Sequence, residues 1–232
     1  MMKKDKIPTT QLITGDAPFE FSEAYKALRT NFNFVTCNKE ARKILIASTI
    51  PNEGKTSVAI NLAISLVQSG KRVLLVDTDM RNPSLHMYLN LKREQEKGLS
   101  SILSGGALWE DCVVETRYGF GLIHGGPIPP NPVELVASKE MQMLMDAALE
   151  KYDYVLCDAP PVGIVTDAAA LSTLCDGVLF VVRQKMGKKN QVMHAVHKLQ
   201  SVNAKILGVI LSHYDMSDMS EKEYGYYSSY RK

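Results

Sequence analysis

Apolar residues recur along the chain in short continuous runs, separated by longer stretches with helical spacing. Continuous runs are typical of strands covered on both faces of a sheet, and the intervening stretches are typical of the covering helices. The pattern predicts strands at Ile44–Ser48, Val73–Asp77, Phe120–His124, Tyr154–Asp158, Val178–Val182 and Ile206–Leu211. It predicts helices at Glu20–Phe34, Thr56–Gln68, Leu99–Leu103, Ser138–Lys151, Thr166–Leu174 and Lys189–Val202.

The order of these elements indicates the fold class. Strands that alternate with helices form βαβ units, so we expect an α/β domain whose mostly parallel central sheet is flanked by helices. In this prediction residues 19–216 form the domain. Residues 1–18 are polar with turn formers, and residues 217–232 have almost no aliphatic side chains, so we expect both ends to be flexible.

Composition and charge exclude several classes of protein. Apolar residues make up 45% of the chain and charged residues 22%, and the net charge of +2 is too small to indicate a nucleic-acid partner. The sequence has no signal-peptide pattern and no apolar run of about 18 residues, so we expect a cytoplasmic protein without a transmembrane segment. The four cysteines include no C-x-x-C pair, which argues against zinc and iron–sulfur sites.

The loop between the first predicted strand and the next helix carries phosphate-binding chemistry. It ends in Gly54-Lys55-Thr56, the core of a P-loop, although Thr49 stands where the usual motif has its first Gly. A helix N-terminus offers N–H groups and a positive dipole end to phosphate oxygens. Lys55 adds a charge for the β- and γ-phosphates, and Thr56 adds a hydroxyl for Mg²⁺. The candidate nucleotide-binding residues are Asn52, Glu53, Gly54, Lys55, Thr56 and Ser57.

Three carboxylates follow predicted strands. Asp77 and Asp79 are two residues apart and would point to one side at the C-terminal end of a strand, where open α/β sheets bind ligands. Asp158 ends another apolar strand, which is the usual arrangement of a metal-holding carboxylate after a P-loop. With Lys55 these residues suit phosphoryl transfer, and either Asp77 or Asp79 is the base. Thr56 and Asp158 are the candidate metal holders, with one carboxylate of the pair, assigned as Asp79, assisting.

Tyrosines gather at the C-terminus. Four of the ten lie within seven positions, and aliphatic neighbours of the kind that surround core tyrosines are missing. The segment is either an unstructured end or a set of phosphorylatable phenols that can reach an active site. Composition leaves both interpretations open for Tyr224, Tyr226, Tyr227 and Tyr230.

In combination these motifs resemble one family. The chain resembles the bacterial tyrosine kinases, specifically the separate catalytic protein of Gram-positive capsular or exopolysaccharide operons, whose P-loop NTPase fold is similar to that of MinD and ParA. Pro51–Ser57 is similar to the family's deviant Walker A motif, Val76–Pro83 to its second acidic motif and Asp158–Pro161 to its Walker B end. Gly126–Leu135 resembles a family loop, and the terminal tyrosines match its autophosphorylation cluster.

The resemblance implies an ATP- and Mg²⁺-dependent protein-tyrosine kinase that phosphorylates its tail tyrosines between subunits of a homo-oligomer and regulates polysaccharide synthesis and export. Many members form rings through a helix motif that here reads Glu23, Lys26 and Arg29, with Lys26 in place of an Arg. The implied partners are the cytoplasmic segment of a membrane polysaccharide co-polymerase, which activates the kinase and recruits it to the inner face of the membrane, and a protein-tyrosine phosphatase.

A second interpretation is a MinD/ParA-like ATPase that switches with nucleotide and has no kinase activity. That class has a signature Lys five residues before the loop Lys, where this chain has Ile50, and it has no reason for a tyrosine tail. A third is an interaction module with an inactive P-loop, against which the intact Lys55 and Thr56 argue. Related ATPases often carry Asn after the last strand, where this chain has Ser212, so the nucleotide-base contacts stay open.

Overall fold

The computed structural model describes residues 11–37, 40–91 and 97–215. Its strands are β1 (Lys43–Ser48), β2 (Val73–Asp77), β3 (Val113–Glu115), β4 (Gly121–Ile123), β5 (Tyr154–Asp158), β6 (Gly177–Arg183) and β7 (Ile206–Ser212). Its α-helices are α1 (Phe19–Cys37), α2 (Lys55–Gln68), α3 (Leu85–Tyr88), α4 (Leu99–Leu103), α5 (Pro132–Val136), α6 (Lys139–Lys151), α7 (Asp167–Ser172) and α8 (Lys189–Gln200). A 3₁₀ turn lies at Glu110–Cys112.

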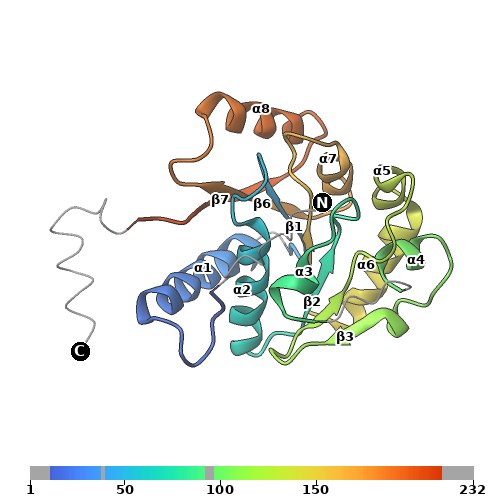
Figure 1. Ribbon diagram of the computed structural model, residues 1–232, viewed down its shortest axis with the longest axis horizontal. Coiled ribbons are helices and arrows are strands. Elements are labelled where there is room, and N and C mark those ends of the chain that lie inside the picture. Colours follow the sequence, from blue (N-terminus) through green and yellow to red (C-terminus); the bar gives the residue numbers. More distant parts are fainter. Residues whose placement is uncertain (1–10, 38–39, 92–96, 216–232) are drawn as a thin grey trace, which may run out of the picture.

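A single sheet in the order β3-β4-β2-β5-β1-β6-β7 separates two layers of helices (Figure 1). Apolar residues of α1, α2 and α3 form the core on one face, and those of α4 to α8 form the core on the other. The strands β1, β2 and β5 are buried on both faces, which explains their continuous apolar sequences. Within the described ranges no helix is long and apolar enough to cross a membrane.

The expected α/β fold with a mostly parallel sheet is confirmed, and the six predicted strands are present. The strand β3, which pairs antiparallel with β4 at the edge of the sheet, was not predicted. Its three residues are too few to give a periodic signal. The short helices α3 and α5 were missed for the same reason, since each is little more than one turn.

The order of the strands brings the candidate chemistry to one edge. β5 lies between β1 and β2, and all three are parallel. Asp158 is in register with Ile46 of β1 and with Asp77 of β2. The loops that follow these strands therefore leave the sheet side by side at its C-terminal edge, the edge at which open α/β sheets bind ligands.

The described part of the N-terminal segment packs against the domain. Ile13 is buried, and its backbone N–H donates to Oδ1 of Asn61 at 2.8 Å. The Nδ2 of Asn61 donates to the carbonyl of Gln11 at 3.0 Å. Part of the segment placed outside the domain in the sequence analysis is thus attached to α2. Residues 1–10 and the tail from residue 216 onward lie outside the described residues.

These contacts predict that the stable unit begins before Phe19. A chain that starts at Phe19 exposes the site of Ile13 and removes two hydrogen bonds of the buried Asn61 amide, which keeps its bond to the carbonyl of Ser57. Its free energy of unfolding should therefore fall by about 2–4 kcal/mol. A chain that starts at Gln11 is the matched control and should stay within about 0.5 kcal/mol of the full chain. Urea unfolding measures both, and equal stabilities would contradict the contacts.

Candidate active site

The loop from Ser48 to Gly54 adopts backbone conformations that only a few residue types allow. Gly54 has φ 85° and directly precedes α2, and Asn52 has φ 66°. Asn is one of the residues that tolerates the left-handed region, so Asn52 supplies the turn that a Gly would otherwise make. At Gly54 a Cβ would lie 3.0 Å from the ring of His213. Gly54 is therefore required for its dihedral angles and for the space it leaves.

The side chain of Glu53 is turned into the loop. Its Oε2 accepts the backbone N–H groups of Thr49 at 2.6 Å and Ile50 at 2.8 Å, and the residue is 1% exposed. Its Oε1 is buried and has no hydrogen-bond partner among the described residues. The carboxylate thus holds the start of the loop against its end. In this structure the side chain shapes the loop from inside, and the prediction that Glu53 belongs to the nucleotide-binding residues stays a prediction.

Side chains at the ends of β6 and β7 hydrogen-bond to backbone carbonyls of the P-loop. Nη1 of Arg183, the last residue of β6, donates to the carbonyl of Asn52 at 3.0 Å. The hydroxyl of Ser212, the last residue of β7, donates to the carbonyl of Glu53. His213 follows, and burial, together with the charge of Arg183, lowers the pKa of its imidazole. Sequence reasoning missed Arg183 and His213 because they are distant in the chain. Their only sequence signal is that each stands at the end of a strand that shares this edge.

Lys55, Thr56 and Asp158 form one buried cluster. Nζ of Lys55 donates to Oδ1 of Asp158 at 2.7 Å, and the Thr56 hydroxyl donates to Oδ2 at 2.8 Å. Asp158 is fully buried at the end of β5, whereas Lys55 and Thr56 start α2. The structure therefore brings together three residues that the sequence placed in the phosphate and metal sites.

Asp77, the last residue of β2, and Asp79, two positions further on, lie in different surroundings. Oδ2 of Asp77 accepts the N–H groups of Ser84 at 3.0 Å and Leu85 at 3.1 Å, so this side chain holds the turn that enters α3. Burial raises the pKa of Asp77 to about 8, and the charge of Asp158 adds to the shift. Asp79 lies past the end of β2, is half-buried, and accepts the N–H of Asn82 at 3.1 Å. Burial also raises the pKa of Asp79.

An ion pair ties the loop after β2 to the segment after β5. Nε of Arg81 donates to Oδ1 of Asp167 at 3.0 Å, and Nη2 donates to Oδ2 at 3.2 Å. Asp167 is 2% exposed at the start of α7. A forked pair of this kind fixes direction as well as distance. The pair therefore positions the backbone that carries Asp79, and it was not predicted from the sequence.

The oxygen atoms at this edge suit magnesium better than a metal that needs a full protein cage. In the described part of the chain no group of three or more His, Cys, Asp or Glu side chains is arranged to hold a metal ion. Mg²⁺ commonly takes one or two carboxylates and completes its shell with phosphate oxygens and water. The Thr56 hydroxyl and the Asp158 carboxylate are such donors. Oδ1 of Asp77 is buried and has no hydrogen-bond partner within the same residues, so it is a third.

The residues predicted to assemble subunits all lie on α1. Nζ of Lys26 pairs with Oε1 of Glu23 at 2.7 Å, and both side chains are partly or fully exposed. Nη1 of Arg29 donates to the carbonyl of Ser65 in α2 at 2.7 Å. Arg29 therefore holds α1 against α2 within one chain. The four tail tyrosines lie outside the described residues.

Comparison with known proteins gives matches over most of the chain. The AAA domain family matches residues 41–209. Tyrosine-protein kinase YwqD of Bacillus subtilis (strain 168) is 37% identical over 209 residues, which cover 90% of this chain and 86% of that protein. The solved structure of the chimerical protein CapA2B2 is 36% identical with a TM-score of 0.78, and the match covers 84% of this chain and 85% of that chain.

A more distant match shows the fold alone. The septum site-determining protein MinD from Pyrococcus horikoshii OT3, solved in complex with Mg-ADP, is 24% identical with a TM-score of 0.63. That match covers 78% of this chain and 75% of that chain. It confirms the expected P-loop architecture, and the higher identity to a tyrosine kinase disfavours the interpretation as a nucleotide switch without kinase activity.

Because Oε2 of Glu53 accepts two backbone N–H groups, we expect substitutions of Glu53 to change the stability of the protein according to whether they keep that oxygen. Glu53→Ala leaves two largely buried N–H groups without an acceptor and should lower the free energy of unfolding by about 2–4 kcal/mol. Glu53→Gln keeps an oxygen that can accept both bonds and should cost less than about 1 kcal/mol. Urea unfolding of the two variants provides the test, and equal losses would show that the oxygen is not what holds the loop.

Proposed function

Because this chain belongs to the bacterial tyrosine-protein kinases, we propose that it transfers the γ-phosphoryl group of ATP to tyrosine hydroxyls, including those of its own tail. The observation that supports this best is that Lys55, Thr56 and Asp158 lie at the same edge of the sheet as Asp77 and Asp79. Bonds of 2.7 and 2.8 Å join the first three. Asp77 is in register with Asp158 on the neighbouring strand.

The N-terminus of α2 binds the phosphates in this proposal. Backbone N–H groups at this helix end receive phosphate oxygens, and the dipole favours their charge. Lys55 starts the same helix and is bonded to Asp158, so its ammonium is a positive charge at this end that can serve the β- and γ-phosphates. As the terminal phosphoryl leaves ADP, Lys55 and these N–H groups stabilise the charge that develops on it.

Asp79 is the proposed base. Asp77 is buried and committed to the turn before α3, whereas Asp79 is half-buried and closer to solvent. Asp79 takes the proton of the tyrosine O–H while the phenol oxygen forms a bond to the γ-phosphorus and the bond from that phosphorus to ADP breaks. Magnesium, when bound, would neutralise phosphate charge and would be held by Thr56 and Asp158. The buried Oδ1 of Asp77 would assist on that side, in place of Asp79.

The acceptors and partners follow from the family. We propose that Tyr224, Tyr226, Tyr227 and Tyr230 receive the phosphoryl group from a neighbouring subunit of a homo-oligomer. Glu23, Lys26 and Arg29 contribute to that assembly, although Arg29 also holds α1 in place. The same reasoning assigns the protein a role in capsular or exopolysaccharide synthesis. Its activator is the cytoplasmic segment of a membrane co-polymerase, which recruits it to the membrane, and a phosphatase reverses its modification.

Because Asp77 and Asp79 have different surroundings, we expect their substitution by Asn to have different effects. Asp79→Asn removes the base and should lower kcat by about 10²–10⁴-fold. It should leave the affinity for a fluorescent ADP analogue and the melting temperature nearly unchanged, because the side chain supports only an exposed turn. Asp77→Asn should shift the melting temperature as well, since Asp77 holds the entry to α3. If Asp79→Asn keeps full kcat, Asp79 is not the base.

If the terminal tyrosines are the acceptors, we expect autophosphorylation to be confined largely to them. The full chain, incubated with ATP and Mg²⁺ in the presence and absence of candidate activator peptide, should gain phosphotyrosine at the four terminal positions. A variant with all four changed to Phe should lose most of that label and still bind the ADP analogue. Mass spectrometry maps the sites, and Lys55→Met is the inactive control. Label that persists on the Phe variant would place the acceptors elsewhere, and a chain that hydrolyses ATP without ever phosphorylating tyrosine would be a nucleotide switch.

A further inference from the structure

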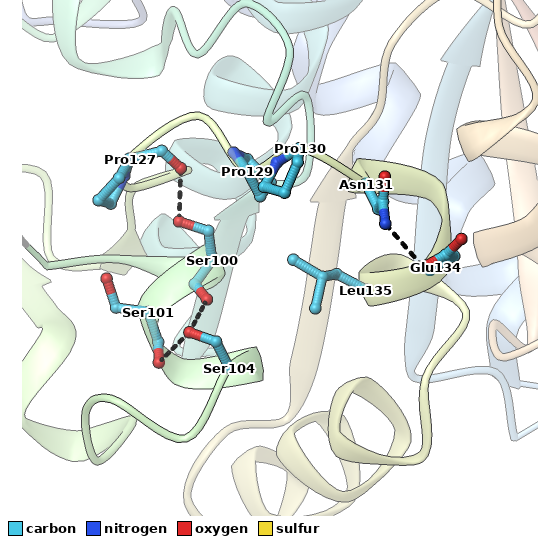
Figure 2. Close-up of a pocket in the computed structure, with 9 residues that line it drawn as sticks. All are labelled: Ser100, Ser101, Ser104, Pro127, Pro129, Pro130, Asn131, Glu134 and Leu135. Carbon is cyan, nitrogen blue, oxygen red and sulfur yellow. Dashed lines mark hydrogen bonds between the residues drawn. The ribbon is translucent and has the colours of Figure 1, made fainter.

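A groove with a cavity of about 420 Å³ lies between α4 and the proline-rich loop that leads into α5. Figure 2 shows serines of α4 along one side, Pro129 and Pro130 above, and the side chain of Leu135 directed into the space between them. Glu134 and Asn131 close one end, where the Asn131 amide donates to the Glu134 carboxylate at 3.1 Å. The volume is in the range of pockets that hold a side chain or small ligand.

The groove is preformed. The Ser100 hydroxyl donates to the carbonyl of Pro127 at 2.6 Å, which fixes the loop to α4. Beneath this bond the chain packs closely, because a Cβ on Gly126 would lie 2.7 Å from that hydroxyl oxygen. The proline rings fix their own φ angles. A ligand that binds here therefore orders little of the protein, which favours affinity.

The groove also adjoins the catalytic edge. The loop that carries the prolines leaves β4, whose neighbour in the sheet is β2. A Cβ on Gly125 would lie 2.9 Å from the ring of Pro83 and 3.5 Å from the carbonyl of Asp77. The residues that follow β4 and those that follow β2 are thus in contact. A peptide seated in the groove would therefore continue toward the end of β2, which carries Asp77.

We propose that this groove binds the C-terminal segment of a second copy of the chain, with Tyr230 between the prolines and the α4 serines and Arg231 against Glu134. This inference rests on the proposed function and identifies how the acceptor segment is held. Proline rings and aromatic rings pack on each other in many peptide-recognition grooves. The Ser104 hydroxyl donates to the carbonyl of Ser100 and keeps lone pairs for a phenol O–H.

Charge selects this tyrosine among the four. Tyr230 is followed by Arg231 and Lys232, whereas Tyr224 is preceded by Glu223. Glu134 is exposed, and its carboxylate can accept from a guanidinium while it accepts from Asn131. With Tyr230 anchored, Tyr224, Tyr226 and Tyr227 lie toward the catalytic edge as acceptors. Tyr230 is modified last, since a phosphorylated Tyr230 can no longer donate to the Ser104 hydroxyl and would release the segment.

The position of β7 favours a second copy over the chain's own tail. The tail leaves the domain after β7, at one edge of the sheet, and the groove lies beyond β4 toward the other edge. Between them stand the loops after β1, β5 and β2, which carry the P-loop and the acids. A tail from the same copy would have to pass these loops to reach the groove, whereas one from a second copy can approach from outside.

A binding experiment tests the groove without requiring catalysis. The probe is a fluorescein-labelled peptide of residues 220–232, titrated with the full chain carrying Tyr230→Ala so that its own tail does not compete. Adding Glu134→Lys should raise Kd about three- to tenfold, because it replaces an attraction by a repulsion. A peptide with Arg231→Glu should recover that loss on the Glu134→Lys chain. Glu150→Lys changes the same charge at an exposed site on α6 and should have no effect.

The peptide's phosphorylation state provides a second arm. Phosphate on Tyr230 should weaken binding more than phosphate on Tyr224. Ser104→Arg, which fills the groove from the exposed end of α4, should weaken binding of every peptide. Circular dichroism and melting temperature verify that the variants are folded. Equal affinity across the Glu134 variants, no recovery by the charge exchange, or no saturable binding would each overturn the proposal.

An experiment that mixes two different chains distinguishes the copy that provides the groove from the copy that provides the tail. An acceptor chain carries Lys55→Met with an intact tail, and a donor chain is active but has four Phe in the tail. Glu134→Lys in the donor should raise KM for the acceptor chain and leave kcat and phosphorylation of a glutamate–tyrosine copolymer unchanged. The same change in the acceptor should have no effect, and an effect there would overturn docking to a second copy. If the unaltered donor phosphorylates neither substrate, the proposed kinase function fails, while the peptide titration still decides the groove.

Discussion

The buried carboxylate of Asp158 is the charge around which the C-terminal edge of the sheet is organised. An ionised group at the end of a central strand is costly unless it is paired and hydrogen-bonded. Lys55 and Thr56 meet that requirement by bonds to its two oxygens. The first turn of α2 must therefore start directly over the end of β5. The position of the P-loop, and hence of any phosphate on it, depends on this contact.

The departure of the loop from the usual P-loop sequence has a structural counterpart. Where the usual motif has a Gly, this chain has Thr49, whose N–H is bound by the carboxylate of Glu53. Arg183 and Ser212 add two bonds to the loop's carbonyls from strands on the far side of β1. The loop is thus held by side chains as well as by its own glycine. Its shape is determined before a nucleotide arrives, which is the condition for electrostatic stabilisation of phosphoryl transfer.

Much of the fold and part of the site could be predicted because their signals are local. Buried strands are continuous apolar runs, and Gly54-Lys55-Thr56 between a predicted strand and a predicted helix, followed by the acidic residues that end later strands, indicates a phosphate site. The edge strand β3 and the short helices α3 and α5 gave no such signal. Asp77 and Asp79 look alike in sequence. They differ in the structure because one is enclosed by the turn before α3 and the other is not.

The sequence by itself determined the α/β class, the presence of a P-loop and the candidate residues for phosphoryl transfer, since each depends on neighbours within a few positions. Tertiary structure decided what those residues touch. Glu53 turns inward, Arg81 pairs with Asp167, and Arg183 reaches the P-loop across 131 positions of sequence. Those contacts exist because parallel strands end at one edge of a sheet, which places residues together that no local pattern relates.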